Sequence, residues 1–162
     1  MLPDLRAGGA ERLHVYLAND WTEKGYSVEF LLMQKRGELL TLLAPDIKVI
    51  SLDVDCIRRF IKPLAVHLRR SRPDIIIAAM WPLTSAAVIS WILSWKCGRL
   101  YLSDHNQLSI SCIEELKVSS LFLKALMRFT YPFANGIIAV SRGVKEDLCS
   151  LGRFRDNQVE VI

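Results

Sequence analysis

Residues 74–104 read DIIIAAMWPLTSAAVISWILSWKCGRLYLSD, and this stretch decides the fold class. Its β-branched run at 75–79 predicts a buried strand, and Trp81-Pro82 interrupts any regular element there. An apolar helix over 83–95 and a second strand over 99–102 follow. Because neither strand alternates apolar with polar residues, the order strand, helix, strand indicates a parallel sheet covered on both faces.

The same stretch has a second interpretation as a membrane span. Residues 75–95 contain no charged side chain, carry Trp near both ends and are followed by Lys96 and Arg99, which is typical of spans. The break at Trp81-Pro82, however, leaves a helix of roughly 20 Å, which is shorter than the hydrocarbon core of about 30 Å. We therefore favour a buried strand followed by a buried helix.

The alternation of strands and helices continues on both sides of this stretch. Hydrophobic periodicity predicts helices at 9–24, 57–72, 83–95, 114–131 and 144–151, and strands at 28–33, 47–52, 75–79, 99–102, 136–140 and 159–162. No repeat or flexible linker interrupts the series. We expect one α/β domain over residues 1–162, with a Rossmann-like, doubly wound, mostly parallel sheet and helices on both faces.

Composition excludes several classes of protein. The chain of 162 residues is 51% hydrophobic and 23% charged, which is typical of globular domains and not of disordered or fibrous ones. Its four cysteines are dispersed, with no CxxC pair and no histidine at ligand spacing. The sequence therefore predicts no metal site and no disulfide framework, and free thiols favour the cytoplasm. Residues 1–6 do not resemble a signal peptide.

The net charge of +4 comes partly from a cluster at Arg69, Arg70 and Arg72. Such a cluster favours phosphates or acidic lipid as partners. Nucleic acid is not expected as a partner, because no nucleic-acid-binding motif accompanies the charge.

Candidate site residues follow the predicted strands, where ligands bind in open parallel sheets. Paired glycines, Gly8 and Gly9, open the first helix, so a ligand can approach its free N–H groups. The other candidates, which supply aromatic, imidazole, hydroxyl and guanidinium groups, are Trp81, His105, Asn106, Ser141 and Arg142. Together they suit a sugar or a phosphorylated ligand. Neither GxGxxG nor GxxxxGK[ST] is present, so dinucleotide-binding and P-loop interpretations lose their main support.

Four segments carry a resemblance to a known family: GGAERLHVYLANDWTEKGYSVEFLL (8–32), RPDIIIAAMW (72–81), YLSDHNQ (101–107) and ANGIIAVSRGVKEDL (134–148). In this order they resemble the N-terminal half of glycosyltransferase family 4, the retaining, nucleotide-sugar-dependent enzymes of GT-B fold. The resemblance implies a domain that binds a saccharide or lipid-linked acceptor. A second, donor-binding domain would hold the nucleotide-sugar, and neither a metal nor another cofactor is obligatory.

The resemblance also implies roles for particular residues. Gly8 and Gly9 would lie near the donor diphosphate and the acceptor, and His105 would be the catalytic residue beside the transferred sugar. Ser141 and Arg142 would line the same cleft, with Trp81 and Asn106 as further substrate-binding residues. Glu11 and Arg12 also match the family pattern; the alternative is that, in the first helical turn, they have only a structural role, complementing the helix dipole or forming a pair.

Structural alternatives remain open for several of these residues. His105 can be a loop residue bonded to its own backbone, and Trp81 can be a core aromatic that stacks on no sugar. Asp104 can orient His105, but neighbouring side chains on extended chain point apart. His14 and His67 lie within helical patterns, so we interpret both as structural.

Two departures from the family pattern concern the ends of the chain. Only residues 1–7 precede the glycines, and Pro3 and Asp4 are poor residues for a central strand. We expect the first, central strand to be missing, which leaves two unpaired strand edges. The chain also stops at Ile162 without a donor-binding domain.

These departures bear on activity, because catalysis needs groups from both sides of the cleft. We expect this chain alone to transfer no sugar, whether it is a gene fragment, a truncated reading frame or half of a split enzyme with a donor-binding domain in trans. The alternative function is a non-catalytic module that binds a phosphorylated sugar or docks a partner protein.

An apolar stripe is interspersed with basic residues near the end of the predicted helix 114–131. Its members are Leu116, Leu121, Phe122, Leu123, Leu126, Met127 and Phe129, with Lys117, Lys124 and Arg128 between them. The stripe can lie in a membrane interface, which would hold the protein peripherally at the inner face of the membrane. The alternative is that it belongs to the core.

Overall fold

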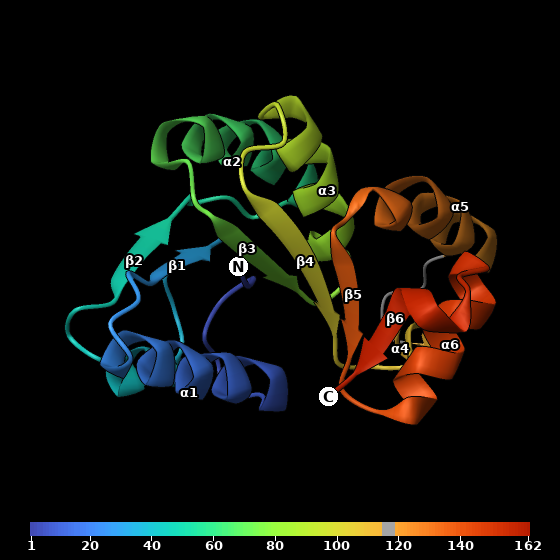
Figure 1. Cartoon of the computed structure of the whole chain (residues 1–162), viewed down its shortest axis with the longest axis horizontal. Helices are drawn as coiled ribbons and strands as arrows, with labels where there is room; N and C mark the ends of the chain where they lie inside the picture. The colour runs from blue at the N-terminus through green and yellow to red at the C-terminus, as the bar shows by residue number, and fades with distance from the viewer. Residues whose placement is uncertain (115–118) are drawn as a thin grey trace.

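The computed structural model describes residues 1–114 and 119–162, without the side chains of 112–114. Two fully parallel sheets are flanked by helices on both faces (Figure 1). The strands are β1 (Glu29–Leu32), β2 (Lys48–Ser51), β3 (Ile75–Ala79), β4 (Arg99–Asp104), β5 (Gly136–Ala139) and β6 (Val159–Val161). The α-helices are α1 (Gly9–Glu23), α2 (Ile57–Ser71), α3 (Leu83–Leu93), α4 (Leu108–Glu114), α5 (Ser120–Thr130) and α6 (Arg142–Gly152). Short 3-10 turns are η1 (Glu38–Leu42), η2 (Tyr131–Phe133) and η3 (Asp156–Gln158). The predicted α/β class is confirmed.

Only the strand predicted at 75–79 has the observed bounds, and two of the differences concern the candidate site and the apolar stripe. The strand expected at 99–102 continues through Ser103 to Asp104, since Asp104 pairs with Ala139 of β5; polar residues there ended the apolar run on which the prediction rested. The helix expected at 114–131 is not one element, because α4 ends at Glu114 and α5 begins at Ser120. Leu116 and Lys117 of the apolar stripe lie outside the described residues.

Two hydrophobic clusters lie on opposite faces of the sheets. Ile76 and Ala78 of β3 belong to a large cluster with α2, α3, α5 and α6, whereas Ala79 belongs to a smaller cluster with α1 and β1. Adjacent residues of β3 therefore serve different layers, as a strand covered on both faces requires. This double coverage explains why the strand has no polar alternation.

The apolar run 75–95 is divided between β3 and α3. Among the helices in the described ranges, none combines the length and the apolar content that crossing a bilayer requires.

The chain start lies between the two sheets, which are β1–β2 and β3–β4–β5–β6. The Met1 amino group donates to the Ile77 carbonyl at 2.6 Å, and the Ala79 N–H donates to the Met1 carbonyl at 3.1 Å. Leu2 pairs in parallel with Leu32 of β1. Met1 and Leu2 therefore join β1 to β3 at the carboxyl ends of these strands (Figure 1).

Ahead of Met1, the position between β1 and β3 holds no strand among the residues that the structure describes, and we call it the unfilled strand position. The backbones of Glu29 and Ile75 border it, and both residues are exposed. Burial lowers the pKa of the Met1 amino group from 8.0 to about 5. Contrary to the expectation that residues 1–7 contribute nothing to the centre of the sheet, Met1 and Leu2 hydrogen-bond to the backbones of β3 and β1.

Gly98, in the turn between α3 and β4, cannot be replaced without strain. Its φ is +74°, and a Cβ added there would lie 2.0 Å from the Pro73 carbonyl oxygen. We expect Gly98→Ala to lower the free energy of unfolding by at least about 2 kcal/mol, because both the backbone conformation and the contact are unfavourable. Urea titration measures this change.

Gly9→Ala is the matched control for Gly98→Ala, since a Cβ at Gly9 meets no atom within 4 Å. We expect its free energy of unfolding to stay within about 0.5 kcal/mol of wild type or to rise slightly. Equal losses in the two variants would contradict the assignment of strain to Gly98.

Candidate functional site

The glycine pair lies at the start of α1, with Gly8 as the residue that precedes the helix in extended conformation. The first helical bond runs from the Arg12 N–H to the Gly8 carbonyl at 3.0 Å, so the N–H groups of the first turn have no acceptor within the helix. The Glu11 carboxylate lies against Gly8, where an added Cβ would approach its Oε2 to 2.1 Å. Glu11 thus places negative charge at the positive end of the helix dipole, whereas Gly9 faces open space.

His14 and His105 bring α1 and the end of β4 together. Their ring centroids lie 5.2 Å apart with the planes tilted by 59°. His14 is buried on α1 and His105 follows β4, so the helix start and the predicted imidazole share the edge formed by the carboxyl ends of the strands (Figure 1). We call this edge the carboxyl rim.

Both imidazoles at the carboxyl rim are neutral near pH 7. Burial lowers the pKa of His14 from 6.5 to about 4 and also lowers the pKa of His105. The Nδ1 of His14 lies 2.8 Å from the Ala10 carbonyl; a carbonyl can only accept, so Nδ1 carries the proton and Nε2 is an acceptor. His105 Nε2 lies 3.1 Å from the Ser103 hydroxyl. These groups suit hydrogen bonding to hydroxyls better than pairing with a phosphate.

Asp104 points away from His105 and into the core. Its Oδ2 accepts from the Tyr131 hydroxyl at 2.9 Å, and that hydroxyl lies 2.9 Å from the Thr84 hydroxyl. Complete burial raises the pKa of Asp104 from 3.8 to about 7. The structure therefore gives Asp104 a partner in α5–η2 and not the imidazole beside it in sequence.

Trp81 lies in the large hydrophobic cluster and is only 9% exposed. Its Nε1 has no hydrogen-bond acceptor within the part of the chain that the structure describes. Little of the ring is therefore available for stacking on a sugar.

The remaining predicted residues are exposed at the carboxyl rim. Asn106 follows His105, and Ser141 precedes α6, where its hydroxyl accepts from the Val144 N–H at 3.3 Å. Arg142 is the first residue of α6. Ser141 is thus a helix cap as well as a candidate ligand contact.

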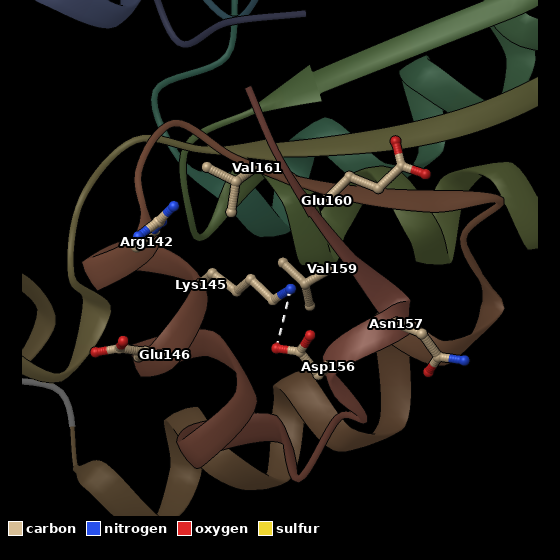
Figure 2. Close-up of a pocket in the computed structure, with 8 residues that line it drawn as sticks. All are labelled: Arg142, Lys145, Glu146, Asp156, Asn157, Val159, Glu160 and Val161. Carbon is tan, nitrogen blue, oxygen red and sulfur yellow. Dashed lines mark ion pairs between the residues drawn. The ribbon is translucent and has the colours of Figure 1, made fainter.

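Arg142 also lines a pocket of about 660 Å³ between α6 and β6 (Figure 2). The other lining residues are Lys145, Glu146, Asp156, Asn157, Val159, Glu160 and Val161, and Lys145 pairs with Asp156 at 2.9 Å. Its three carboxylates outnumber its two cations, so the pocket does not favour a diphosphate. Of the residues predicted for the site, only Arg142 lines it.

His67 differs from the other two histidines. Its Nε2 lies 2.5 Å from a carboxylate oxygen of Glu29, and both residues lie away from the carboxyl rim on α2 and at the start of β1. This contact agrees with its interpretation as a structural residue.

Comparison with known proteins gives the family. A sequence profile described as Glycosyltransferase Family 4 matches residues 7–162. The chain belongs to glycosyltransferase family 4. No curated protein sequence matches the chain significantly.

Solved structures of GT-B glycosyltransferases share the fold of this family 4 chain. HepE from Anabaena, in complex with UDP, matches with a TM-score of 0.71 and 19% identity over 99% of this chain and 42% of that chain. HepE in complex with UDP-glucose matches with a TM-score of 0.67 and 21% identity, over 99% and 42%. WaaB, described as a lipopolysaccharide outer core galactosyltransferase, matches in its apo form with a TM-score of 0.65 and 15% identity, over 99% and 45%. The chain thus spans less than half the length of these structures.

Sequence reasoning missed one residue of the carboxyl rim, His14. It lies on the apolar face of α1, which favoured a structural interpretation, and only the packing of α1 beside β4 places its ring against His105. The available signal was its position about one and a half turns after the glycine pair, on a helix expected to begin at the site.

Proposed function

We propose that this chain is the acceptor-binding side of a retaining glycosyltransferase that uses a nucleotide-sugar as donor and needs no other cofactor. The acceptor is a saccharide or a lipid-linked saccharide, and the product is a surface polysaccharide or another glycoconjugate. The enzyme works in the cytoplasm, peripherally at the inner face of the membrane. The observation that carries the proposal is the ring contact between His105 and His14, which lies on the helix that the glycine pair opens, in a chain of family 4.

His105 is the proposed catalytic residue. A neutral imidazole beside the Ser103 hydroxyl can hydrogen-bond to a hydroxyl of the transferred sugar. Because it carries no positive charge, it does not attract the phosphates of the donor. His14 supports the ring of His105 from α1, so we add it as a positioning residue.

The substrate-binding residues in this proposal are Gly8, Gly9, Asn106, Ser141 and Arg142. The open space at Gly9 lets a ligand reach the free N–H groups of α1. Trp81 is the last substrate-binding residue in this proposal, and it shapes the site from the core, because both its ring and its indole N–H are buried. The UDP and UDP-glucose of the HepE complexes support a uridine nucleotide as the donor class.

Donor-binding groups lie outside these 162 residues in this proposal, so the chain alone transfers no sugar. Purified chain mixed with UDP-glucose or UDP-galactose and saccharide acceptors should release no UDP above the rate without protein. A fusion that places the donor-binding half of a family 4 enzyme after Ile162 should release UDP and form a glycoside. Transfer by the 162-residue chain alone would contradict the need for a second half.

Variants of the active fusion test the residue roles. We expect Gly9→Val to abolish turnover by blocking approach to the backbone, and His105→Ala to lower kcat at least about 100-fold. His67→Ala is the matched control, since this histidine contacts Glu29 away from the rim, and its turnover should match wild type. Unchanged turnover in Gly9→Val would remove the glycine pair from the mechanism. Saturable binding of a phosphorylated sugar without transfer by any fusion would favour a non-catalytic module.

A further inference from the structure

The turn between α3 and β4 displays an exposed tryptophan on a rigid support. Trp95 is 82% exposed, the largest exposed fraction among the large hydrophobic residues described. Trp95 and Lys96 both have left-handed backbones, with φ of 66° and 56°. The indole N–H of Trp91 donates to the Cys97 and Gly98 carbonyls at 3.1 and 3.2 Å. A strained turn fixed in this way costs little entropy when Trp95 inserts into a partner.

Two cations, Arg69 and Lys96, lie at this turn. The Arg69 guanidinium carbon lies 5.9 Å from the centre of the Trp95 ring, and the same guanidinium donates to the Leu93 carbonyl. The Lys96 amino group lies 5.7 Å from the centre of the Phe133 ring. Within the described residues, neither Arg69 nor Lys96 has a carboxylate at ion-pair distance, so both charges are available to an anionic partner.

Large apolar side chains continue this surface. Leu93 is 49% exposed and Phe133 is 50% exposed. One helical turn before Phe133, on α5, Phe129 is 76% exposed, whereas Leu123 and Met127 on the inner side of α5 are fully buried. The helix thus has an apolar inner face and a second apolar face toward solvent. We define the Trp95 surface as Arg69, Leu93, Trp95, Lys96, Phe129 and Phe133.

We propose that the Trp95 surface docks this protein on a lipid bilayer that contains anionic headgroups. Tryptophan and phenylalanine partition into the interface between headgroups and acyl chains, while arginine and lysine bind the phosphates at the same depth. The surface offers both kinds of group side by side. It deepens the proposed peripheral position by naming the contact surface and the lipid class.

The position of the Trp95 surface determines how the protein sits on the bilayer. Residues 94–98 and Phe133 precede β4 and β5, so the surface lies at the amino ends of the strands, opposite the carboxyl rim (Figure 1). Docking there leaves His105 and the start of α1 free to bind ligand. Substitutions in the Trp95 surface should therefore weaken membrane binding and leave ligand binding at the carboxyl rim unchanged, and the reverse should hold for substitutions at the rim.

Vesicle flotation tests the proposal with the 162-residue chain itself. We expect the chain to bind vesicles of phosphatidylcholine with 30% phosphatidylglycerol much more tightly than vesicles of phosphatidylcholine alone. Trp95→Ser should weaken binding roughly tenfold, the loss of one large apolar side chain from the interface. The double variant Arg69→Ala/Lys96→Ala should weaken binding to the anionic vesicles about 25-fold, or about fivefold per cation.

Matched controls separate a specific surface from general charge and apolar attraction. Tyr26→Ser removes an aromatic side chain that is 66% exposed in the turn after α1. Lys35→Ala/Arg58→Ala removes two exposed cations elsewhere, so its net charge equals that of the double variant. Both controls should bind within about threefold of wild type, because general charge attraction is screened over about 10 Å.

Three results would overturn the proposal: no binding of the wild-type chain to anionic vesicles, equal binding of Trp95→Ser and Tyr26→Ser, or equal losses in the two double variants. Circular dichroism verifies that each variant is folded. The vesicle assay contains no nucleotide-sugar, so a lack of vesicle binding would not contradict the proposed glycosyl transfer. Likewise, a lack of transfer by the fusion would not contradict vesicle binding.

Discussion

We expect a chain extended ahead of Met1 by four apolar residues, Val-Ile-Val-Val, to unfold at a temperature roughly 10 °C higher than the 162-residue chain, for a gain on the order of 3 kcal/mol. The added residues would enter the unfilled strand position in parallel with β1 and β3. There they would hydrogen-bond to the backbones of Glu29 and Ile75 and bury their side chains between the two hydrophobic clusters. These gains exceed the conformational entropy lost by about four residues.

The buried amino group of Met1 adds a pH dependence to this gain. Because burial lowers its pKa from 8.0 to about 5, the unfolded chain binds more protons between these values, and the stability of the native chain rises from pH 5 to pH 8. An extension replaces the amine by a neutral amide. The gain should therefore be larger at pH 6 than at pH 9, as differential scanning calorimetry at the two pH values would measure.

Two control chains separate the strand from the loss of charge. N-terminal acetylation removes the charge and adds no strand, so it should give only the pH-dependent part of the gain. A Gly-Asp-Pro-Gly extension cannot continue a central strand and should give none of the strand contribution. If it stabilised the chain as much as Val-Ile-Val-Val, the unfilled strand position would not accept a strand.

Asp104→Asn should be the variant whose effect depends most on pH. Burial raises the pKa of Asp104 from 3.8 to about 7, so the native chain holds a proton that the unfolded chain releases. The stability contributed by this carboxyl group is full below pH 3.8 and is lost as the pH rises toward 7. Asparagine never ionises, and its carbonyl can still accept from Tyr131.

We therefore expect the free energy of unfolding of Asp104→Asn, relative to wild type, to rise by about 4 kcal/mol between pH 4 and pH 8. At pH 4 the variant should be slightly less stable than wild type, because its amide N–H group replaces an oxygen that has no partner among the described residues. The contributions of His14 and Met1 cancel in the difference between the two chains.

Urea unfolding at pH 4, 6 and 8 measures the Asp104→Asn difference. Asp46→Asn, at an exposed site, is the control and should change stability equally at all three values. Parallel curves for Asp104→Asn and wild type would mean that Asp104 is not buried with a proton.

The sequence was sufficient to predict the α/β class and most of the elements, because each strand contains a short apolar run and the strands alternate with amphipathic or apolar helices. The run at 75–79 matches β3 residue for residue, since Pro73 and Trp81-Pro82 delimit it. The predicted element boundaries were wrong where tertiary contacts override the preference of the local sequence. Ser103 and Asp104 are polar, yet they complete β4 because His105 and Tyr131 supply the hydrogen bonds that their burial requires.

The candidate site could be predicted only in part. Rules for parallel sheets identified the edge and the glycine pair, and His105 followed from its place after a strand. The contact with His14 could not be predicted, because the distance between α1 and β4 depends on how the two sheets pack. The burial of Trp81 could not be predicted either, since periodicity does not distinguish a core aromatic from one at a rim.

Among the described residues, the backbones of Met1 and Leu2 alone join the two sheets. We therefore expect the two sheets to unfold less cooperatively than a single continuous sheet would. We also expect the amide protons of the segment from α1 to β2 to exchange with solvent before those of β3–β6, because local opening of this segment breaks fewer backbone hydrogen bonds than global unfolding. His14 moves with the former segment and His105 with the latter. A molecule that binds both imidazoles would therefore stabilise the contact between the two segments. Its affinity would decrease if the two segments separated.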